Sequence, residues 1–488
     1  MVIIKHLPAL QILIPFFAAL FSAISYNKYI AWLVALTATI CSLILALYGL
    51  PIAANNINYD FGNWPAPIGI AYHLDNLNQP IIVYINLVLT IFLLFGFGLI
   101  KNTILKFIDS KRQHLFFTML LFAHTGFLGV ISTNDLFNLY VFIEISSLAS
   151  YVLMSKGNNP RALVGAFDYL ILGTIGATLI LIAIGFLLAF TGSLNISDIA
   201  TIIKDHSNSR IIITAVVFFI TGAILKMAFF PMHFWMIRAY STTSPFMLSY
   251  MAAISSIVGI YMIMRFIHFV IDDTIILAII STIIRPMALI TIIICTFVAF
   301  RTKNIKIIII YSTASQIGYS LLLLTIIPAR ELLFQFLILD SINKIALFTI
   351  IAYIQNETDE LLIDNFQMIK DSKLFKILVA FSLIFSAGLP LTSMFFIKIK
   401  IFDLLFNSKL YLEFIIVIIG SIFAILYHMR IVKAIYFAPN TDNTIIINNK
   451  LYGLVFIVLL QFISLLYINN IAKFTINTES ILSLLNSI

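Results

Sequence analysis

The feature that most constrains this chain is a series of long apolar runs that follow one another from end to end. A run of about 18 or more such residues is typical of a transmembrane helix, because about 20 residues cross the hydrocarbon core. Of the 488 residues, 61% are hydrophobic and 10% are charged, whereas soluble domains carry roughly 25% charged residues. The composition therefore predicts an integral membrane protein and excludes a soluble enzyme. Runs such as 305–310 lack the alternation of barrel strands, so an all-α polytopic fold is expected.

The apolar runs predict about fourteen transmembrane spans. They lie near 7–26, 30–51, 79–100, 114–133, 136–155, 163–191, 211–240, 246–268, 275–300, 305–327, 331–354, 374–406, 411–436 and 450–470. Pro231 interrupts the seventh span, and Gly388 and Pro390 interrupt the twelfth. A proline inside a helix removes a backbone hydrogen bond and clashes with the preceding turn. Such breaks mark transport paths in membrane proteins, although each alone is also compatible with a simple packing kink.

The distribution of lysine and arginine among the loops predicts the orientation of the chain. Segment 101–112 carries four basic residues, and later loops of the same side contain further ones, including Lys370. Loop 52–78, on the other side, contains no lysine or arginine. The positive-inside rule then places 101–112 in the cytoplasm and both termini outside. We expect a multi-pass protein in contact with the lipid bilayer.

The sequence offers no motif for a cofactor, a metal or a nucleotide. Its two cysteines, Cys41 and Cys295, lie singly inside apolar runs and are expected to be small buried side chains. Iron–sulfur and zinc sites need clustered thiolates, and a nucleotide site needs a glycine-rich loop. The basic residues occupy short loops, so nucleic-acid binding is not expected either. Whether the chain belongs to an enzyme stays open at this point.

Four ionisable residues stand far from span ends, and these are the candidates for function. They are Glu144, Lys226, Lys344 and Lys398. A charge at a helix centre costs ~2.5–3.5 kcal/mol on insertion scales, so a functional role is the default hypothesis. Burial disfavours the charged form of both residue types, which favours exchange of protons between them. The alternative is a structural ion pair or a lysine that extends to the interface.

Two further residues are expected to act beside these four. His233, just beyond Pro231, could pass protons on, or could be a structural histidine at the helix break. Asp340 precedes Lys344 by four residues, so the two share a helix face in the favourable order for an ion pair. Asp340 is therefore predicted to hold Lys344 protonated and to modulate its exchange.

Several stretches, in the same order, resemble a known family. They are GNWPAPIGI (62–70), NDLFNLYVFIEISSLASY, TGSLNISDIA (191–200), LKMAFFPMHFW, YSTASQIGY (311–319) and AGLPLTS. The chain resembles the D subunit of Mrp-type sodium/proton antiporters, which is homologous to the proton-pumping membrane subunits of respiratory complex I. The resemblance covers the chain from about residue 62 to the twelfth span.

The resemblance implies one transmembrane domain over 1–488. Its fourteen helices would form two inverted repeats with the seventh and twelfth discontinuous, a conducting core over about 79–406, and peripheral helices in 1–78 and 411–488. It implies that Glu144 pairs with Lys226 and that Lys344 and Lys398 extend the relay. Other subunits of a membrane complex, protons and Na⁺ would then be the partners, and no cofactor would be bound.

The sequence departs from the family pattern at several positions. Ile257 stands where a lysine is usual before the V-G-x-Y segment, and Ser341 where a histidine is usual. Leu391 and Met394 replace a proline and a glycine of the GLPPxSG pattern, and WMIRAY (235–240) lacks the proline of WLPxAY. Three functions therefore stay open: an antiporter subunit, a subunit of a complex I-type NADH:quinone oxidoreductase, and a scaffold that no longer conducts.

Overall fold

The structure is a computed structural model. It describes residues 6–54, 56–156, 160–204, 206, 209–267, 274–326, 329–357, 361–363, 373–436 and 452–466. Lys370 lies outside these ranges. In the described part, twelve helices are long and apolar enough to cross a membrane. They are α2 (Leu7–Ile24), α3 (Lys28–Ala53), α4 (Asn78–Thr103), α5 (Gln113–Ser132), α6 (Leu136–Met154), α7 (Arg161–Thr191), α9 (Arg210–Met227), α11 (Pro245–Arg265), α12 (Thr274–Arg301), α13 (Ile305–Leu324), α14 (Arg330–Glu357) and α17 (Tyr411–Tyr436).

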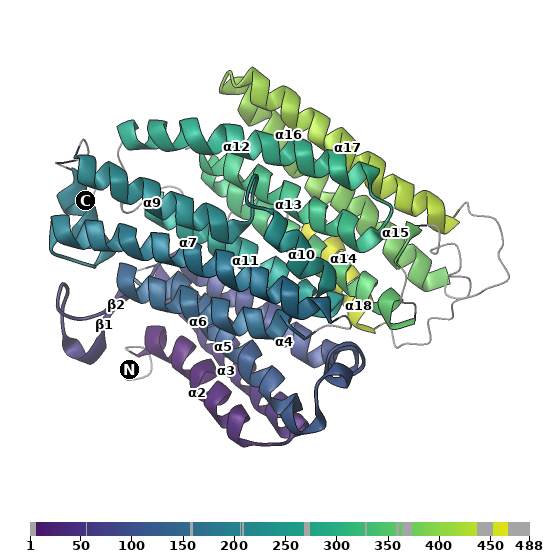
Figure 1. Ribbon diagram of the computed structural model, residues 1–488, viewed down its shortest axis with the longest axis horizontal. Helices are drawn as coiled ribbons and strands as arrows, with labels where there is room; N and C mark the ends of the chain where they lie inside the picture. The colour runs from purple at the N-terminus through teal and green to yellow at the C-terminus, as the bar shows by residue number, and fades with distance from the viewer. Residues whose placement is uncertain are drawn as a thin grey trace.

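Five shorter helices complete the described bundle. They are α8 (Ile196–Lys204), α10 (Phe234–Thr242), α15 (Lys373–Ala387), α16 (Ser393–Asn407) and α18 (Tyr452–Leu466). Figure 1 shows most of the helices running side by side along the longest axis of the molecule. The all-helical polytopic fold is thus confirmed. Because α15, α16 and α18 are each only 15 residues long, the total of fourteen spans stays a prediction, as does the inverted repeat.

Both expected helix breaks are present. Helix α9 ends at Met227, the next residue, Ala228, has a left-handed φ of 54°, and α10 starts only at Phe234. The indole of Trp235 donates to the Leu225 carbonyl at 3.0 Å, an acceptor near the end of α9. This bond satisfies one of the carbonyls near the end of α9, while Pro231 and Met232 at the break are exposed at the surface of the chain.

The second break separates α15 from α16. Gly388 has a φ of 74° and Leu391 a φ of 72°, both in the left-handed region. Glycine adopts this conformation at no steric cost, and Pro390 cannot continue the helix. Thr392 then caps α16 by accepting from the Phe395 amide at 3.3 Å. The chain consequently crosses this region as two half-helices.

A β-hairpin covers one end of the bundle, and the sequence did not predict it. Strands β1 (Ile57–Asp60) and β2 (Ala71–Leu74) pair antiparallel, and Figure 1 shows them at the left end of the helices. His6, at the start of α2, bonds through Nδ1 to the Tyr59 hydroxyl at 2.9 Å. The start of α2 and the hairpin therefore lie on the same face, which we call the hairpin face.

The opposite ends of the helices form a second face, which we call the basic face. The Thr243 hydroxyl, beyond α10, donates to the Met154 carbonyl at the end of α6 at 3.2 Å. Lys306, at the start of α13, donates from Nζ to the Thr243 carbonyl at 2.5 Å. These bonds bring the ends of α6 and α10 together with the start of α13. The basic residues near 156–161 and 301–306 consequently share one face, as the sequence predicted.

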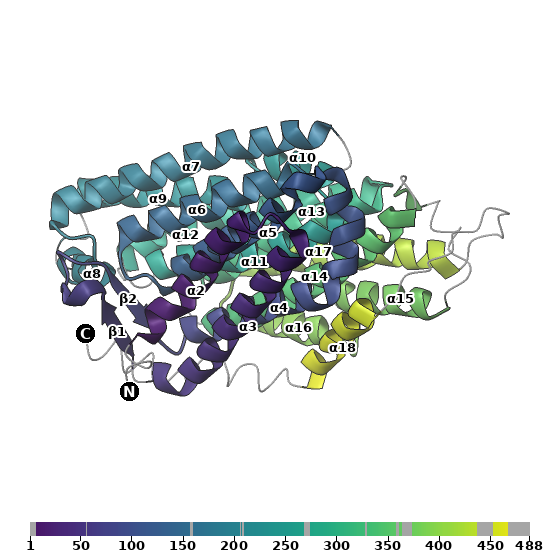
Figure 2. The same cartoon turned by 90° about the horizontal axis from the view of Figure 1, so that it is seen from below.

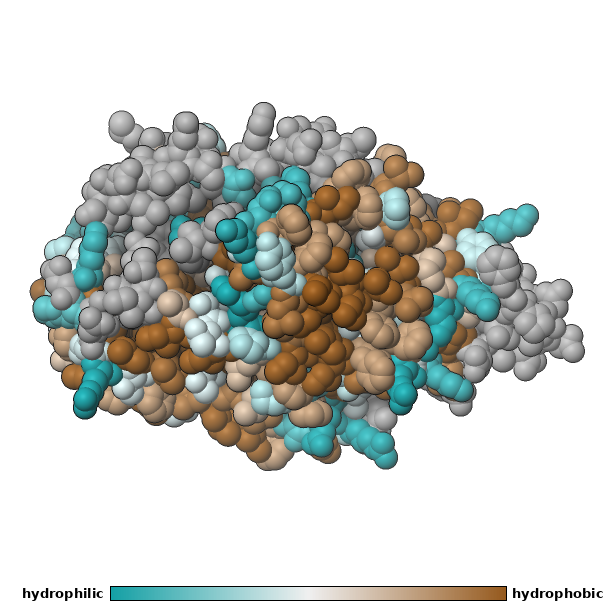
Figure 3. Space-filling view, turned by 90° about the horizontal axis from the view of Figure 1, so that it is seen from above, coloured by the Kyte–Doolittle hydropathy of each residue, from teal (hydrophilic) through white to brown (hydrophobic). Residues whose placement is uncertain are grey.

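Helices α7 and α9 cross with their backbones in direct contact. A Cβ placed on Gly222 would lie 2.4 Å from the Gly176 carbonyl oxygen, which is closer than real Cβ contacts. Small residues at such a crossing allow close packing where no hydrophobic effect drives helices together. Figure 2 shows α7 and α9 lying along each other. Figure 3 shows a broad hydrophobic area across the middle of one face of the molecule.

Candidate functional site

The first pair of ionisable residues lies between α6 and α9, and the side chains of both are partly buried, at 20% and 12% exposure for Glu144 and Lys226. Lys226 Nζ is 3.6 Å from Glu144 Oε1, and it donates to the Ser147 hydroxyl at 2.9 Å. Ser147 stands three residues after Glu144, so one face of α6 presents both groups to the lysine. Lys226 belongs to the last turn of α9, where exposed carbonyls attract a cation. The structure thus brings together the two residues that the sequence predicted to pair.

A small cavity continues from Lys226 toward the centre of the bundle. Its volume is about 40 Å³, and Lys226, Ser255, Ser256 and Thr313 are among its lining residues. A cavity needs about 10–15 Å³ to hold one water, so this one has room for roughly three. The cavity is polar along one side because hydroxyl groups of α11 and α13 face it. It can therefore carry hydrogen-bonded water between Lys226 and α11.

Lys344 lies on the far side of that cavity, on α14. Its Nζ donates to the Ser256 hydroxyl at 3.0 Å and lies 2.5 Å from Asp340 Oδ2. The predicted ion pair of Asp340 and Lys344 is therefore present, and both side chains are nearly inaccessible, at 5% and 4%. Ser256 is the group that joins the cavity beside Lys226 to Lys344. Sequence reasoning missed it, because a serine inside a helix carries no distinctive signal.

Two residues that depart from the family pattern, Ile257 and Ser341, lie next in sequence to Ser256 and near Lys344. Ile257 is 2% exposed and belongs to the hydrophobic core, so the usual lysine position is apolar here. Ser341 forms a short hydrogen bond with the Tyr84 hydroxyl of α4. That contact joins α14 to α4, whereas Lys344 bonds toward α11.

Lys398 occupies the second helix break. Its Nζ donates to the carbonyl of Ala387, the last residue of α15, at 3.1 Å. The carbonyl end of a helix attracts a cation, and the side chain is 3% exposed. A smaller cavity of about 10 Å³, just large enough for one water, lies between Lys344 and Ser386, the residue before Ala387. Lys398 therefore continues the row of buried groups, and no ion-pair partner for it is found among the described residues.

His233 lies at the first break but outside the row. The ring is 2% exposed and packs against Phe234, with ring centroids 4.3 Å apart. It does not line the cavity beside Lys226. Another histidine lies closer to the far end of the row: His428 of α17 is fully buried and within electrostatic range of Lys398. A histidine inside an apolar run was the available signal for it.

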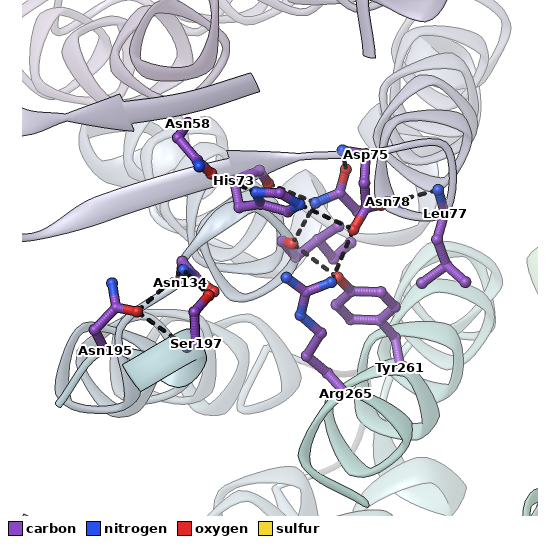
Figure 4. Close-up of polar contacts among 11 residues, drawn as sticks. Asn58, His73, Asp75, Leu77, Asn78, Asn134, Asn195, Ser197, Tyr261 and Arg265 are labelled. Atoms are coloured by element: carbon purple, nitrogen blue, oxygen red, sulfur yellow. Dashed lines mark hydrogen bonds and ion pairs between the residues drawn. The ribbon is translucent and has the colours of Figure 1, made fainter. Parts of the chain in front are cut away.

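A second polar cluster, which the sequence analysis also missed, lies under the hairpin face (Figure 4). Arg265 Nη1, at the end of α11, donates to Asp75 Oδ2 at 2.8 Å, and both side chains are buried. The Asp75 Oδ1 accepts from the amides of Leu77 and Asn78 at 2.9 and 2.7 Å. Burial raises the pKa of Asp75, but the Arg265 guanidinium and these bonds outweigh it and hold the pKa below its usual value. The cluster anchors the chain between β2 and α4.

His73 of β2 adjoins this cluster. Its Nε2 is 3.6 Å from Asp75 Oδ2, a distance at which a protonated ring would form an ion pair. Burial nevertheless lowers the pKa of His73 to about 4, with a further contribution from the positive charge of Arg265. These effects exceed the attraction of Asp75, which is already engaged with Arg265. His73 is therefore a neutral ring at neutral pH.

No group of three or more histidine, cysteine, aspartate or glutamate side chains that could hold a metal ion occurs in the part of the chain that the structure describes. What the geometry provides instead is a row of ammonium, carboxylate and hydroxyl groups. It begins at Glu144, passes Lys226, Ser256 and Lys344, and ends at Lys398. Broken helices with buried ionisable residues define a membrane protein of the ion-transporting class.

Comparison with known proteins identifies the family. Residues 133–424 match the family described as NADH:quinone oxidoreductase/Mrp antiporter, TM, and the chain belongs to it. It is 30% identical over 445 residues to a Staphylococcus aureus protein named as antiporter subunit mnhD2, covering 89% of this chain and 86% of that one. It is 33% identical over 324 residues to NADH-quinone oxidoreductase subunit N of Desulforudis audaxviator. That match covers 65% of this chain and 63% of the subunit N length.

Solved structures confirm the fold. The chain in an archaeal membrane-bound sulfane sulfur reductase superposes with a TM-score of 0.86 at 22% identity, covering 97% of this chain and 96% of that one. A chain of the Mrp complex from Dietzia sp. DQ12-45-1b superposes with a TM-score of 0.85 at 18% identity, with the same coverage. Both neighbours are chains of membrane complexes.

Proposed function

We propose that the chain is the proton-translocating D-type subunit of a multisubunit monovalent cation/proton antiporter. The observation that carries this proposal is the partly buried ion pair of Glu144 and Lys226, 3.6 Å apart on two helices, with a polar cavity leading onward from the lysine. Ionisable side chains at membrane depth are costly, so a functional role is the default hypothesis for them. The likeness to the antiporter subunit mnhD2 supports the same function.

The proposed relay uses the row of buried groups in sequence. A proton passes between Glu144 and Lys226, crosses waters in the 40 Å³ cavity, and reaches Lys344 through the Ser256 hydroxyl. A hydroxyl both donates and accepts, so it can hand a proton on without ionising. In the proposed relay, Ser256 therefore takes the role that a lysine, at the position of Ile257, has in the wider family. From Lys344 the relay continues toward Lys398.

The proposed setting follows from the same resemblance. Other subunits of a membrane complex are the partners, and Na⁺ is the proposed exchanged cation. The protein is placed in a bacterial inner membrane with both termini outside and the basic face in the cytoplasm. The conducting core spans about 79–406, with the helices before and after it at the periphery. His233 is proposed to serve protons near the first break, and Asp340 to modulate Lys344.

A second function is favoured by one observation, the 33% identity to an NADH-quinone oxidoreductase subunit N. In that case the same relay would serve a complex of the NADH:quinone oxidoreductase type. Native co-purification followed by mass spectrometry separates the two functions. Small Mrp-type partners support the antiporter, and NADH- or quinone-binding partners support the oxidoreductase.

Proton flux into proteoliposomes that hold the assembled complex tests the relay. Lys226→Ala and Glu144→Ala should each abolish flux, because either change removes one member of the exchanging pair. The double variant should be equally inactive but better tolerated, since no lone ionisable group remains buried. Lys204→Ala, which removes an exposed lysine of α8, is the matched control and should retain flux.

The relay is wrong if the Lys226→Ala complex transports at the wild-type rate. An intact wild-type complex without flux would instead support the non-conducting scaffold, for which the apolar side chain of Ile257 is the argument. Ile257→Lys is then the substitution expected to restore flux.

A further inference from the structure

An apolar groove runs along the flank of the bundle between α4, α11, α14 and α18. The cavity in it has a volume of about 250 Å³, and its lining is almost wholly apolar. It opens at the surface, because Leu87, Phe95 and Ile463 at its margin are 37%, 42% and 45% exposed. Among the few polar side chains of its lining is Thr349. The hydroxyl of Thr349 is buried and has no hydrogen-bond partner in the described part of the chain.

A basic cavity lies at the end of the same helices, on the basic face. Its volume is about 400 Å³, and Lys28, Lys101 and Lys106 line it together with polar side chains that include Asn102 and Asn356. None of the three lysines forms an ion pair with a described acidic residue. Three ammonium groups around one cavity attract an anion, and phosphate is the anion that occurs at this depth of a bilayer.

The two cavities are successive sections of one surface. On α4, Phe95 and Leu99 line the apolar cavity and Asn102 lines the basic one, at positions i, i+4 and i+7 of one helix face. On α14, Tyr353 lines the first and Asn356, three residues on, lines the second. Three residues span about 4.5 Å along a helix. An apolar chain and an anionic group a few ångströms apart therefore match this surface.

We propose that an anionic phospholipid of the bilayer binds along α4 and α14. Its phosphate lies among Lys28, Lys101 and Lys106, and one acyl chain fills the apolar cavity. Thr349 lies seven residues from Asn356, about 10 Å along α14, where its hydroxyl can donate to an ester carbonyl of the lipid. A free phosphate would leave the apolar cavity unused. An uncharged lipid would leave the three lysines without a counter-ion.

Native mass spectrometry of the delipidated full-length chain tests this site. Phosphatidylglycerol should bind, while phosphatidylcholine with the same acyl chains should bind at least tenfold more weakly. Replacing Lys28, Lys101 and Lys106 by glutamine should lower phosphatidylglycerol affinity at least tenfold, because each lysine near an anionic head group is worth about fivefold. The matched control replaces Lys111, Arg112 and Lys303, which are exposed residues outside the cavity.

Ile91→Trp tests the apolar section separately. Ile91 lines the apolar cavity, so the larger ring should fill it and weaken phosphatidylglycerol while leaving a dioctanoyl analogue with shorter chains less affected. Thermal unfolding without lipid confirms that each variant is folded. Inorganic phosphate and glycerol phosphate at millimolar concentration should not displace the lipid.

Four results would overturn the proposal. The control triple could lower the affinity as much as the cavity triple, which would indicate general charge attraction. Phosphatidylcholine could bind equally well, which would indicate an apolar groove alone. Free phosphate could displace the lipid, which would indicate a soluble-anion site. The complex co-purified with its partner subunits could lack the lipid and carry a partner helix on α4 and α14, which would make this surface a subunit interface.

Discussion

Acidification should loosen the segment that joins the hairpin to α4, because His73 is held neutral there. Its ring bonds to Asn58 Oδ1 at 2.5 Å and lies beside Asp75 and Arg265. The pKa of His73 is lowered to about 4 in the folded protein, against 6.5 for an unperturbed ring. As the pH falls, the opened state therefore binds a proton before the folded state does. The stability that His73 contributes is constant above about pH 7, is lost between roughly pH 6.5 and 4, and changes no further below.

The size of the effect follows from the shift. A difference of about 2.5 pKa units corresponds to roughly 3.4 kcal/mol in total, of which about 1.8 kcal/mol is lost between pH 7 and pH 5. The side chain of His73 is 19% exposed, so solvent screening makes these values upper limits. Asp75 does not add to the loss in this window. Its lowered pKa keeps its contribution intact above about pH 4, and that contribution disappears only at still lower pH.

Hydrogen exchange of the Leu77 and Asn78 amides measures the opening directly, because both amides donate to Asp75. After correction for intrinsic exchange rates, protection should fall by about tenfold to twentyfold from pH 7 to pH 5 in the full-length protein. His73→Gln should remove this dependence, since glutamine does not titrate. His6→Gln, at another histidine of the hairpin face, is the matched control and should retain it. An unchanged pH dependence in His73→Gln would refute the reasoning.

Asp340→Asn should raise proton flux or shift its pH optimum downward, because Lys344 loses its carboxylate partner. Ser256→Ala should slow proton flux, because it interrupts the hydroxyl link to Lys344. Proteoliposome flux against pH measures both, and unchanged profiles would mean that neither partner acts on Lys344. In a variant without native cysteines, Asn56→Cys should react with an impermeant reagent only from outside and Ser110→Cys only from the cytoplasm, so labelling of both from one side contradicts the orientation.

Hydropathy predicted the helices well, because a bilayer imposes one length and one composition on every span. The prolines inside two spans predicted both breaks, since proline cannot continue a helix. The hairpin escaped prediction for a physical reason. Strands of four residues such as INYD have no room for a recognisable alternation, and their pairing depends on contacts such as the bridge between Tyr72 and Thr133, far apart in sequence.

Some residues of the candidate site could be predicted from the sequence, and others could not. Glu144, Lys226 and Lys398 could be found because a charge inside an apolar run is conspicuous. Ser256 could not, because its importance comes only from lying between a cavity and a lysine on another helix. Arg265 had a usable signal: it is a basic residue at the hairpin-face end of a span, where the positive-inside rule expects few.

The contact between Gly176 and Gly222 limits how this protein can move. A Cβ on Gly222 would already be 2.4 Å from the Gly176 carbonyl, so sliding α9 past α7 by one turn, about 5.4 Å, would bring Phe218 or Lys226 of the same helix face into space that a methyl group cannot enter. The two helices must move as one rigid body, with Lys226 held at a fixed depth on it. Sliding of α9 along α7 is thereby excluded from any conformational change in a transport cycle. Any rocking of a helix bundle that contains one of these two helices must carry the other with it.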